Sequence, residues 1–231
     1  MKKILLIISI LSCLNFSVTS QNLPMADIRP IHFGFILGIN AMDFGIKPSM
    51  LEIDGKVYQA DVSQLTPGFS VGVIGDVRLG KYFNFRLIPS LHLGERTLSY
   101  INDKNSNIDE QNIKSYVLTV PVYFKYSSVR IKNYRPYLIA GGGLAFDLGR
   151  DRQLPVLLKQ FDYFVDFGVG CTIYFPFFRL SPELKFAMGF NNILTPHSER
   201  SGDFIFNDQK FLTNALSRLT SRMFTLVFNF E

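Results

Sequence analysis

The chain has few of the residues that build disulfides or metal sites. Its 231 residues include two cysteines, Cys13 and Cys171, and three histidines, His32, His92 and His197. No pair of these histidines has the spacing of metal ligands, so the sequence predicts no metal site. A mature chain that keeps only Cys171 cannot form an internal disulfide. Because that cysteine falls in an apolar strand pattern, we interpret it as a packing residue.

Long hydrophobic runs are confined to the start of the chain. Residues 1–20 combine a basic start, an apolar core and a small-residue cleavage site, Val18-Thr19-Ser20, before Gln21. We therefore expect a signal peptide over residues 1–20 and a mature domain over residues 21–231. A lipoprotein box that ends at Cys13 is the alternative, although the apolar segment continues past it.

The mature region lacks the features of several other classes. It contains no run of 18 or more apolar residues, which excludes a helical membrane protein. Removal of residues 1–20 takes away Lys2 and Lys3, so the net charge falls from +5 to +3, which indicates no nucleic-acid partner. The run Gly141-Gly142-Gly143 lies inside a strand pattern and not in a phosphate-binding loop. The sequence predicts no cofactor.

Apolar residues instead recur at every second position. The chain is 47% hydrophobic and 14% aromatic, with 23 Phe and no Trp. In residues 68–79, Phe69 and Val71 alternate with Ser70 and Gly72, a pattern that a helix would not give. Eight segments alternate in this way, at 31–47, 68–79, 83–96, 115–126, 136–149, 161–175, 178–190 and 221–231.

The connections between these segments are long and short in turn. Short ones fall near Gly80, at 127–135 and at Pro176. Long ones fall at 48–66, 100–113, 150–160 and 191–220. This alternation, with an even strand count, is typical of outer-membrane barrels, whose turns are periplasmic and whose loops are extracellular. We predict an all-β fold, an eight-stranded antiparallel transmembrane β-barrel in the cell outer membrane, with both termini periplasmic.

A soluble lipocalin-like barrel is the competing interpretation, since it also has eight antiparallel strands. Alternation alone does not say which face is inside. Aromatic residues near the strand ends favour the membrane barrel, where they form interfacial girdles against lipid. They are Tyr82, Phe83, Tyr100, Tyr116, Tyr126, Tyr137, Tyr163, Phe175, Phe177 and Phe178.

The polar face of the strands carries charged residues. In a narrow barrel they would be buried, and buried charges must pair or accept hydrogen bonds. We expect an interior network of salt bridges, in preference to a path for protons or ions. Its candidate members are Asp76, Arg78, Arg86, Arg96, Lys125, Asp166, Arg179, Glu183 and Lys185.

The last long connection is the best candidate for a partner contact. Residues 191–220 are longer than a connection needs, and long apolar loops are usually functional or packed over the barrel mouth. Helical spacing in its second half makes a short amphipathic helix plausible there. The candidate contact residues are Phe204, Phe206, Phe211, Leu212 and Leu216.

No recognisable catalytic motif occurs. His92, Ser99, His197 and Ser198 are the residues that a lipid-modifying barrel enzyme would use, but none lies in a motif. We predict that the protein is not an enzyme. A generic small barrel, serving as adhesin, structural protein or receptor, is the alternative to the function considered next.

Several stretches resemble known barrels of Bacteroidetes. Residues 118–126 and 135–143 resemble the small outer-membrane barrels of that group in general. Residues 180–194 and the terminal stretch 216–231 are similar to the PorT/SprT family of type IX secretion system barrels. The resemblance implies an accessory or assembly role in protein secretion, and in gliding motility where it occurs, through contacts with other secretion proteins. The last strand, with Phe228 and Phe230 before Glu231, resembles the signal that the outer-membrane assembly machinery reads.

Overall fold

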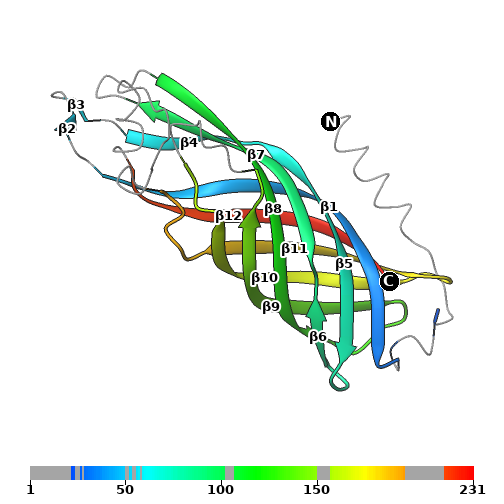
Figure 1. Cartoon of the computed structure of the whole chain (residues 1–231). Coiled ribbons are helices and arrows are strands. Elements are labelled where there is room, and N and C mark those ends of the chain that lie inside the picture. The colour runs from blue at the N-terminus through cyan, green and yellow to red at the C-terminus, as the bar shows by residue number, and fades with distance from the viewer. Residues whose placement is uncertain are drawn as a thin grey trace, which may run out of the picture.

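The computed structural model describes residues 22–23, 27, 29–49, 52–53, 56–57, 59–101, 107–149, 157–195 and 216–231. The expected signal peptide and the loop residues Phe204, Phe206, Phe211 and Leu212 lie outside this range. Figure 1 shows antiparallel strands wrapped into a barrel that is longer on one side than on the other. The strands are β1 (Ile31–Pro48), β2 (Glu52–Ile53), β3 (Lys56–Val57), β4 (Gln59–Leu65), β5 (Pro67–Arg78), β6 (Phe83–Leu87), β7 (Ser90–Ile101), β8 (Asn107–Ser127), β9 (Tyr134–Asp147), β10 (Phe161–Tyr174), β11 (Arg179–Gly189) and β12 (Leu216–Phe230).

The described strands close into a ring of eight. β1 pairs on one side with β12 and on the other with β5, so the first and last strands seal the barrel. β6 and β7 keep one register against β8, and together they form a single wall strand that Pro89 interrupts. β4 and β5 likewise follow one another along β7, with a register shift before Leu65. The predicted eight-stranded antiparallel barrel is confirmed.

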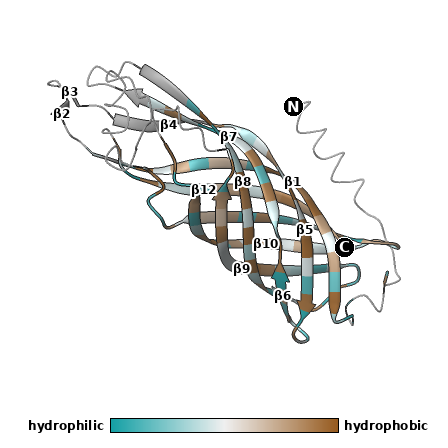
Figure 2. Ribbon diagram, viewed as in Figure 1, coloured by the Kyte–Doolittle hydropathy of each residue, from teal (hydrophilic) through white to brown (hydrophobic). Residues whose placement is uncertain are grey.

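The outward face of the barrel is apolar and the inward face is largely polar. Phe33 is 78% exposed and Val73 is 59% exposed, whereas Arg86 is fully buried. Figure 2 shows hydrophobic and hydrophilic residues alternating along the wall strands. This is the reverse of a soluble barrel and is the arrangement that lipid requires. The lipocalin-like alternative is therefore wrong.

The barrel extends beyond its lipid-facing band on the side of the long connections. β8 has 21 residues, about twice the 9–11 that a spanning strand needs. At the loop-side end of this band, outward-facing residues of opposite charge are register partners on neighbouring strands. They are Asp43 with Arg222 and Glu95 with Lys114. Such opposite charges stabilise a ladder in water but not in lipid. We place the upper edge of the lipid-facing band at these two pairs.

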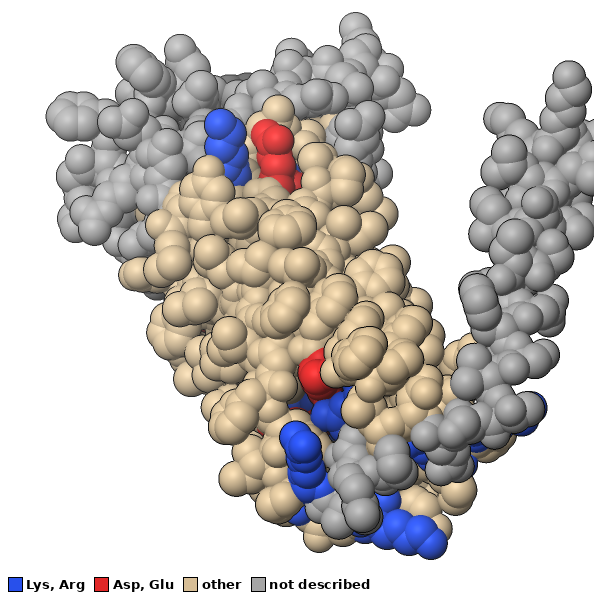
Figure 3. All heavy atoms as spheres, turned by 90° about the vertical axis from the view of Figure 1, so that its right-hand side faces the viewer, with Lys and Arg blue, Asp and Glu red and all other residues tan. Residues whose placement is uncertain are grey.

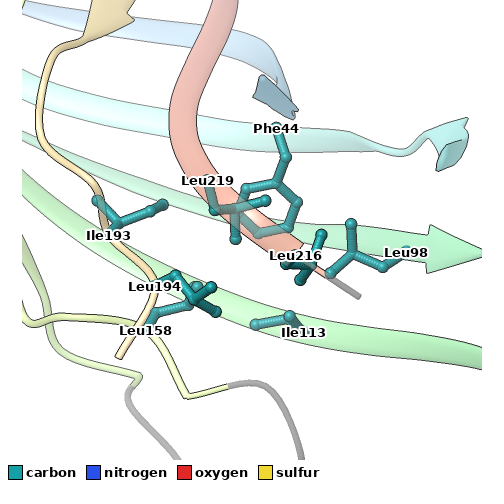
Figure 4. Close-up of a cluster of buried hydrophobic side chains, with 8 residues drawn as sticks. All are labelled: Phe44, Leu98, Ile113, Leu158, Ile193, Leu194, Leu216 and Leu219. Carbon is teal, nitrogen blue, oxygen red and sulfur yellow. The ribbon is translucent and has the colours of Figure 1, made fainter. Parts of the chain in front are cut away.

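Inside this extension the inward face turns apolar. Phe44, Leu98 and Ile113 from the wall pack with Leu158, Ile193 and Leu194 from two connections and with Leu216 and Leu219 of β12. Figure 4 shows these side chains pointing toward one another between the strands. The cluster closes the barrel interior from the loop side with a small hydrophobic core.

Three predicted connections are wrong in part. The segment 48–66 contains β2, β3 and β4, and β8 already begins at Asn107, inside the predicted loop 100–113. β12 begins at Leu216, so the last five residues of the predicted loop 191–220 are strand, and Leu216 and Leu219 are not helical. Tyr137, predicted as a girdle residue, is 3% exposed and points into the barrel.

Candidate functional site

The interior of the barrel near the short turns is organised around Arg86. Its Nε donates a hydrogen bond to Asp76 Oδ2 at 2.7 Å, and its Nη2 donates to Glu231 Oε1. Nη1 lies 3.9 Å from Glu183 Oε2. The guanidinium thus joins three carboxylates from β5, β11 and the end of the chain. A buried charge of this kind is stable only with such partners.

The pairing of β5 with β6 brings Asp76 next to Arg86. Asp76 and Arg86 are register partners across the β5–β6 ladder, on the inward face of both strands. Asn84 Nδ2 also donates to Asp76 Oδ1, so both oxygens of that carboxylate are occupied. Arg179 reaches the other oxygen of Glu231 at 2.6 Å. The short-turn half of the interior is therefore cross-linked between opposite walls.

A second layer joins Tyr123, Asp166, Lys185 and Glu183. The Tyr123 hydroxyl donates to Asp166 Oδ2 at 2.5 Å, and Lys185 Nζ donates to the Tyr123 oxygen at 3.4 Å. Lys185 Nζ also lies 3.6 Å from Glu183 Oε1. Because Glu183 faces both Arg86 and Lys185, the two layers form one continuous network.

Tyr137 and Asn229 complete the network. Tyr137 donates to Glu183 Oε2 at 2.7 Å, and Asn229 Nδ2 lies 3.3 Å from the same oxygen. Lys125 Nζ lies 4.0 Å from the centroid of the Tyr137 ring, a cation–π contact. The carboxylate of Glu183 is thus held by hydrogen bonds and by two cations.

Two glycines make room for the interior tyrosines. Gly141 is the register partner of Tyr123, and a Cβ added there would stand 2.7 Å from the Tyr123 ring and 2.1 Å from the Val122 carbonyl oxygen. Gly170 is likewise the partner of Tyr137, and its Cβ would stand 2.4 Å from that ring. Each ring lies across a neighbouring strand only because that strand has no side chain there.

The structure places the sequence-predicted charges in three groups. Asp76, Arg86, Lys125, Asp166, Glu183 and Lys185 come together in the network just described, and Arg179 joins it. Arg78 lies at the rim, where its Nε donates to the Gly80 carbonyl at 2.9 Å. Arg96 lies higher in the barrel and packs over the Phe44 ring, with 4.8 Å between guanidinium and centroid.

Sequence reasoning missed Glu231, Tyr123, Tyr137 and Asn229 as members of the network. All four lie on inward positions, so the alternation that marks Lys125 also marks Tyr123, and the alternation that marks Val227 also marks Asn229 and Glu231. The sequence therefore contained the signal, because these residues lie at the alternate positions that face inward. It was obscured because aromatic and terminal residues have other ordinary uses in barrels.

Of the residues that an enzyme would use, the two that the structure describes, His92 and Ser99, are buried. Ser70 Oγ lies 2.8 Å from His92 Nδ1, and His92 Nε2 lies 3.1 Å from Thr119 Oγ1. Ser70 is fully buried and Ser99 is 5% exposed, so neither faces lipid or water. His197 and Ser198 lie outside the described residues. In the part of the chain that the structure describes, no three His, Cys, Asp or Glu side chains converge as metal ligands.

Where the structure describes the chain, the interior is filled by side chains and is not channel-like. Cavities of about 30 Å³ beside Arg96 and about 20 Å³ beside Glu231 are of the size that holds one water molecule. Between them lie the salt-bridge network and a cluster that includes Ile36, Ile74 and Ile88. The arrangement can stabilise the barrel and join its walls. Within the described part of the chain there is no helix long and apolar enough to cross a membrane.

A comparison with protein families agrees with this architecture. Residues 19–195 match the family described as outer membrane protein beta-barrel domain. Among solved structures, the chain is similar to the crystal structure of the outer membrane protein OprG from Pseudomonas aeruginosa, with 10% identity, a TM-score of 0.45, and coverage of 93% of this chain and 96% of that one. No curated protein matches the chain. Because the family match covers more than half of its length, the chain belongs to the outer membrane protein beta-barrel domain family.

Proposed function

We propose that this outer-membrane barrel is an accessory or assembly subunit of the type IX protein secretion machinery and acts through protein contacts. Two lines of reasoning support the proposal. Residues 180–194 and 216–231 resemble the PorT/SprT family of that machinery. In addition, the filled interior favours a role in contact over a role in transport. Where the organism glides, the same role extends to gliding motility.

The filled interior is the observation that carries this choice. Arg86 and Glu183 are 0% and 1% exposed at the centre of the barrel, and an apolar cluster closes the loop side. A barrel of eight strands has room for its own side chains or at most for one small ligand. Cargo would therefore pass through another protein, and this subunit would assist that protein.

The proposed orientation follows the general rule for outer-membrane barrels, in which the turns are periplasmic and the long loops are extracellular. We place the short turns, the N-terminal segment and the C-terminal residue on the periplasmic side, with the extension beyond Asp43 and Glu95 outside the cell. Asn22 lies at the short-turn end, where its backbone N donates to Asn133 Oδ1 at 2.9 Å, and Glu231 lies at the same end.

Deletion of the gene in its native host tests the function. The assay measures secreted proteins that carry C-terminal sorting domains in the medium and trapped precursors in the periplasm. Precursors that accumulate in the deletion strain and disappear on complementation would support the secretion role. Normal secretion would exclude it and leave a generic surface barrel that serves as adhesin, structural protein or receptor.

Complementation with loop variants tests the predicted contact residues. We would replace Phe204, Phe206, Phe211 and Leu212 together with Ser, and compare a control with Ala at Ser201, Asn207 and Gln209 of the same segment. If the loop contacts a partner, the first variant inserts into the outer membrane at the wild-type level but fails to restore secretion. Equal complementation by both variants would mean that the partner contact does not depend on these four residues.

A further inference from the structure

The short-turn end of the barrel carries cations and almost no acids. Arg29, Lys81 and Lys132 are exposed there, and Arg78, Arg130 and Arg135 lie beside them. Figure 3 shows Lys and Arg gathered around the lower end of the molecule. At the opposite end of the lipid-facing band the charges are mixed, as the pairs of Asp43 with Arg222 and Glu95 with Lys114 show.

The nearest acid at this rim is already engaged. Asp27 Oδ1 lies 3.1 Å from Arg135 Nη1, and Asp27 Oδ2 lies 3.6 Å from Arg130 Nη1. None of the ion pairs among the described residues involves Arg29, Lys81 or Lys132. These three cations are therefore available to an anion from outside the chain.

Aromatic and apolar side chains are exposed at the same end of the barrel. Phe175 and Phe178 stack with 4.9 Å between ring centroids, Phe178 continues to Phe230, and Phe230 stacks on Phe35. This band runs from the turn between β10 and β11 across β12 to β1. The turn residues beyond it are also apolar and exposed: Leu79 60%, Val129 58%, Ile131 65% and Phe177 93%.

Aromatic rings beside cations are typical of the layer where lipid headgroups meet hydrocarbon. In that layer the cations stand at the depth of lipid phosphates, and the apolar turn residues enter the hydrocarbon boundary. Lys81 and Tyr82 show this arrangement of a cation beside an aromatic ring, since Lys81 Nζ lies 5.3 Å from the centroid of the Tyr82 ring. An acidic water-soluble protein would match the charge but would leave Phe177 and Ile131 in water.

We infer that the short-turn rim is a binding surface for anionic glycerophospholipids, with Arg29, Lys81 and Lys132 holding the headgroup phosphate and Phe177 inserted beside the acyl chains. With this rim on the periplasmic side, the ligand belongs to the inner leaflet. The inference goes beyond the secretion role and holds for any function of the barrel.

The absence of tryptophan from the chain provides a direct test. Phe177→Trp places a single fluorophore at the rim of the full mature protein, refolded into vesicles of phosphatidylethanolamine with a minority of phosphatidylglycerol. One lipid is brominated in a first set of vesicles and the other lipid in a second set. Quenching of the indole fluorescence then reports which lipid lies next to the indole. Leu148→Trp, at the loop-side end of β9, is the matched reporter at the other rim.

We expect brominated phosphatidylglycerol to quench the rim indole several-fold more than brominated phosphatidylethanolamine at equal content, and the Leu148→Trp indole equally. Each cation contributes about a fivefold preference near an anionic surface. Arg29→Gln/Lys81→Gln/Lys132→Gln should abolish the preference, as should high salt. The control Lys47→Gln/Lys114→Gln/Lys159→Gln, which removes the same charge on the loop side, should keep it.

Three results would overturn the inference. They are equal quenching by both lipids at the rim, a preference that survives removal of the three cations, and a stronger preference for lipid A phosphates when that lipid replaces phosphatidylglycerol in the vesicles. The gel-mobility shift of the folded barrel confirms that each variant is folded. Since these assays use purified protein, they are independent of the secretion assay, and either proposal can fail alone.

Discussion

Arg86 and Glu231 join the two walls of the barrel across its interior. Arg86 lies on β6, whereas Glu231 follows β12 and is the last residue of the chain. The Glu231 backbone also bonds with Arg179 of β11, with 2.8 Å between Arg179 N and the Glu231 carbonyl oxygen. The chain terminus is thus held on β11 by its backbone and on β6 by its side chain, close to the seam where β12 meets β1.

Replacement of Arg86 should therefore be among the most damaging single changes in the barrel. Arg86→Met keeps the bulk of the side chain but leaves Asp76, Glu183 and Glu231 without their shared cation. Breaking a buried ion pair by removing one partner costs about 3–5 kcal/mol. Urea unfolding of the refolded protein in detergent micelles would measure the loss.

Arg78→Met is the control for this prediction. Arg78 differs by lying at the rim, with a hydrogen bond to a turn carbonyl and no carboxylate partner among the described ion pairs. Its loss should change the free energy of unfolding by less than about 1 kcal/mol. Equal destabilisation by the two variants would mean that the buried Arg86 charge contributes no more to stability than the charge of an arginine at the rim.

Gly141 is expected to be intolerant of even one methyl group. In Gly141→Ala the new Cβ would collide with the Val122 carbonyl oxygen and the Tyr123 ring, and would push that ring away from Asp166. Overpacking of this kind costs about 1–3 kcal/mol. Thermal unfolding should show the loss, whereas Gly75→Ala, whose Cβ would meet its nearest atom at 4.0 Å, should unfold like the wild type. A tolerated Gly141→Ala would show that the Tyr123 ring has room to move.

Leu219 should anchor the apolar cluster that closes the loop side. It is fully buried against Phe44 and Leu216, so Leu219→Ala should cost about 2–4 kcal/mol through lost burial and a residual cavity. Ser217→Ala, on an exposed neighbour, should cost less than about 0.5 kcal/mol. Urea titrations of both variants would separate the two, and similar midpoints would mean that the Leu219 side chain is not packed in the cluster.

The region around Leu216 also shows where sequence patterns reach their limit. Leu216 and Leu219 are three residues apart, which predicts a helix, yet both point into the barrel from one strand. The ladder with β1 shifts register between Lys47 and Pro48, so one residue of β12 is extra and the inward parity changes. A bulge of this kind depends on the partner strand and leaves no mark in local alternation.

Elsewhere the alternation of apolar and polar residues was sufficient to predict the strands, because the two faces of each strand differ in polarity. Phe69, Val71 and Val73 against Ser70 and Asp76 predict a strand with one apolar and one charged face, and the burial of the charged face agrees. Alternation alone could not say which face met lipid. The inward-facing charges pair with residues on other strands. The sequence does not predict these pairs, because they depend on the register of the strands in the closed ring.

The position of the lipid-facing band leads to the last prediction. Val165 is 44% exposed near the middle of β10, between the outward-facing Tyr163 and Phe167. Arginine on the lipid face costs about 2–4 kcal/mol at the bilayer midplane and about 0–1 kcal/mol near the interface. Val165→Arg should therefore lower the free energy of unfolding in lipid vesicles by several-fold more than Ser217→Arg, which lies above the pair of Asp43 with Arg222. In water both positions would count as exposed and both changes would be mild. Equal costs for the two arginines would place the band elsewhere, whereas unequal costs would place the upper edge of the membrane between Val165 and Ser217, the interval that contains the pair of Asp43 with Arg222.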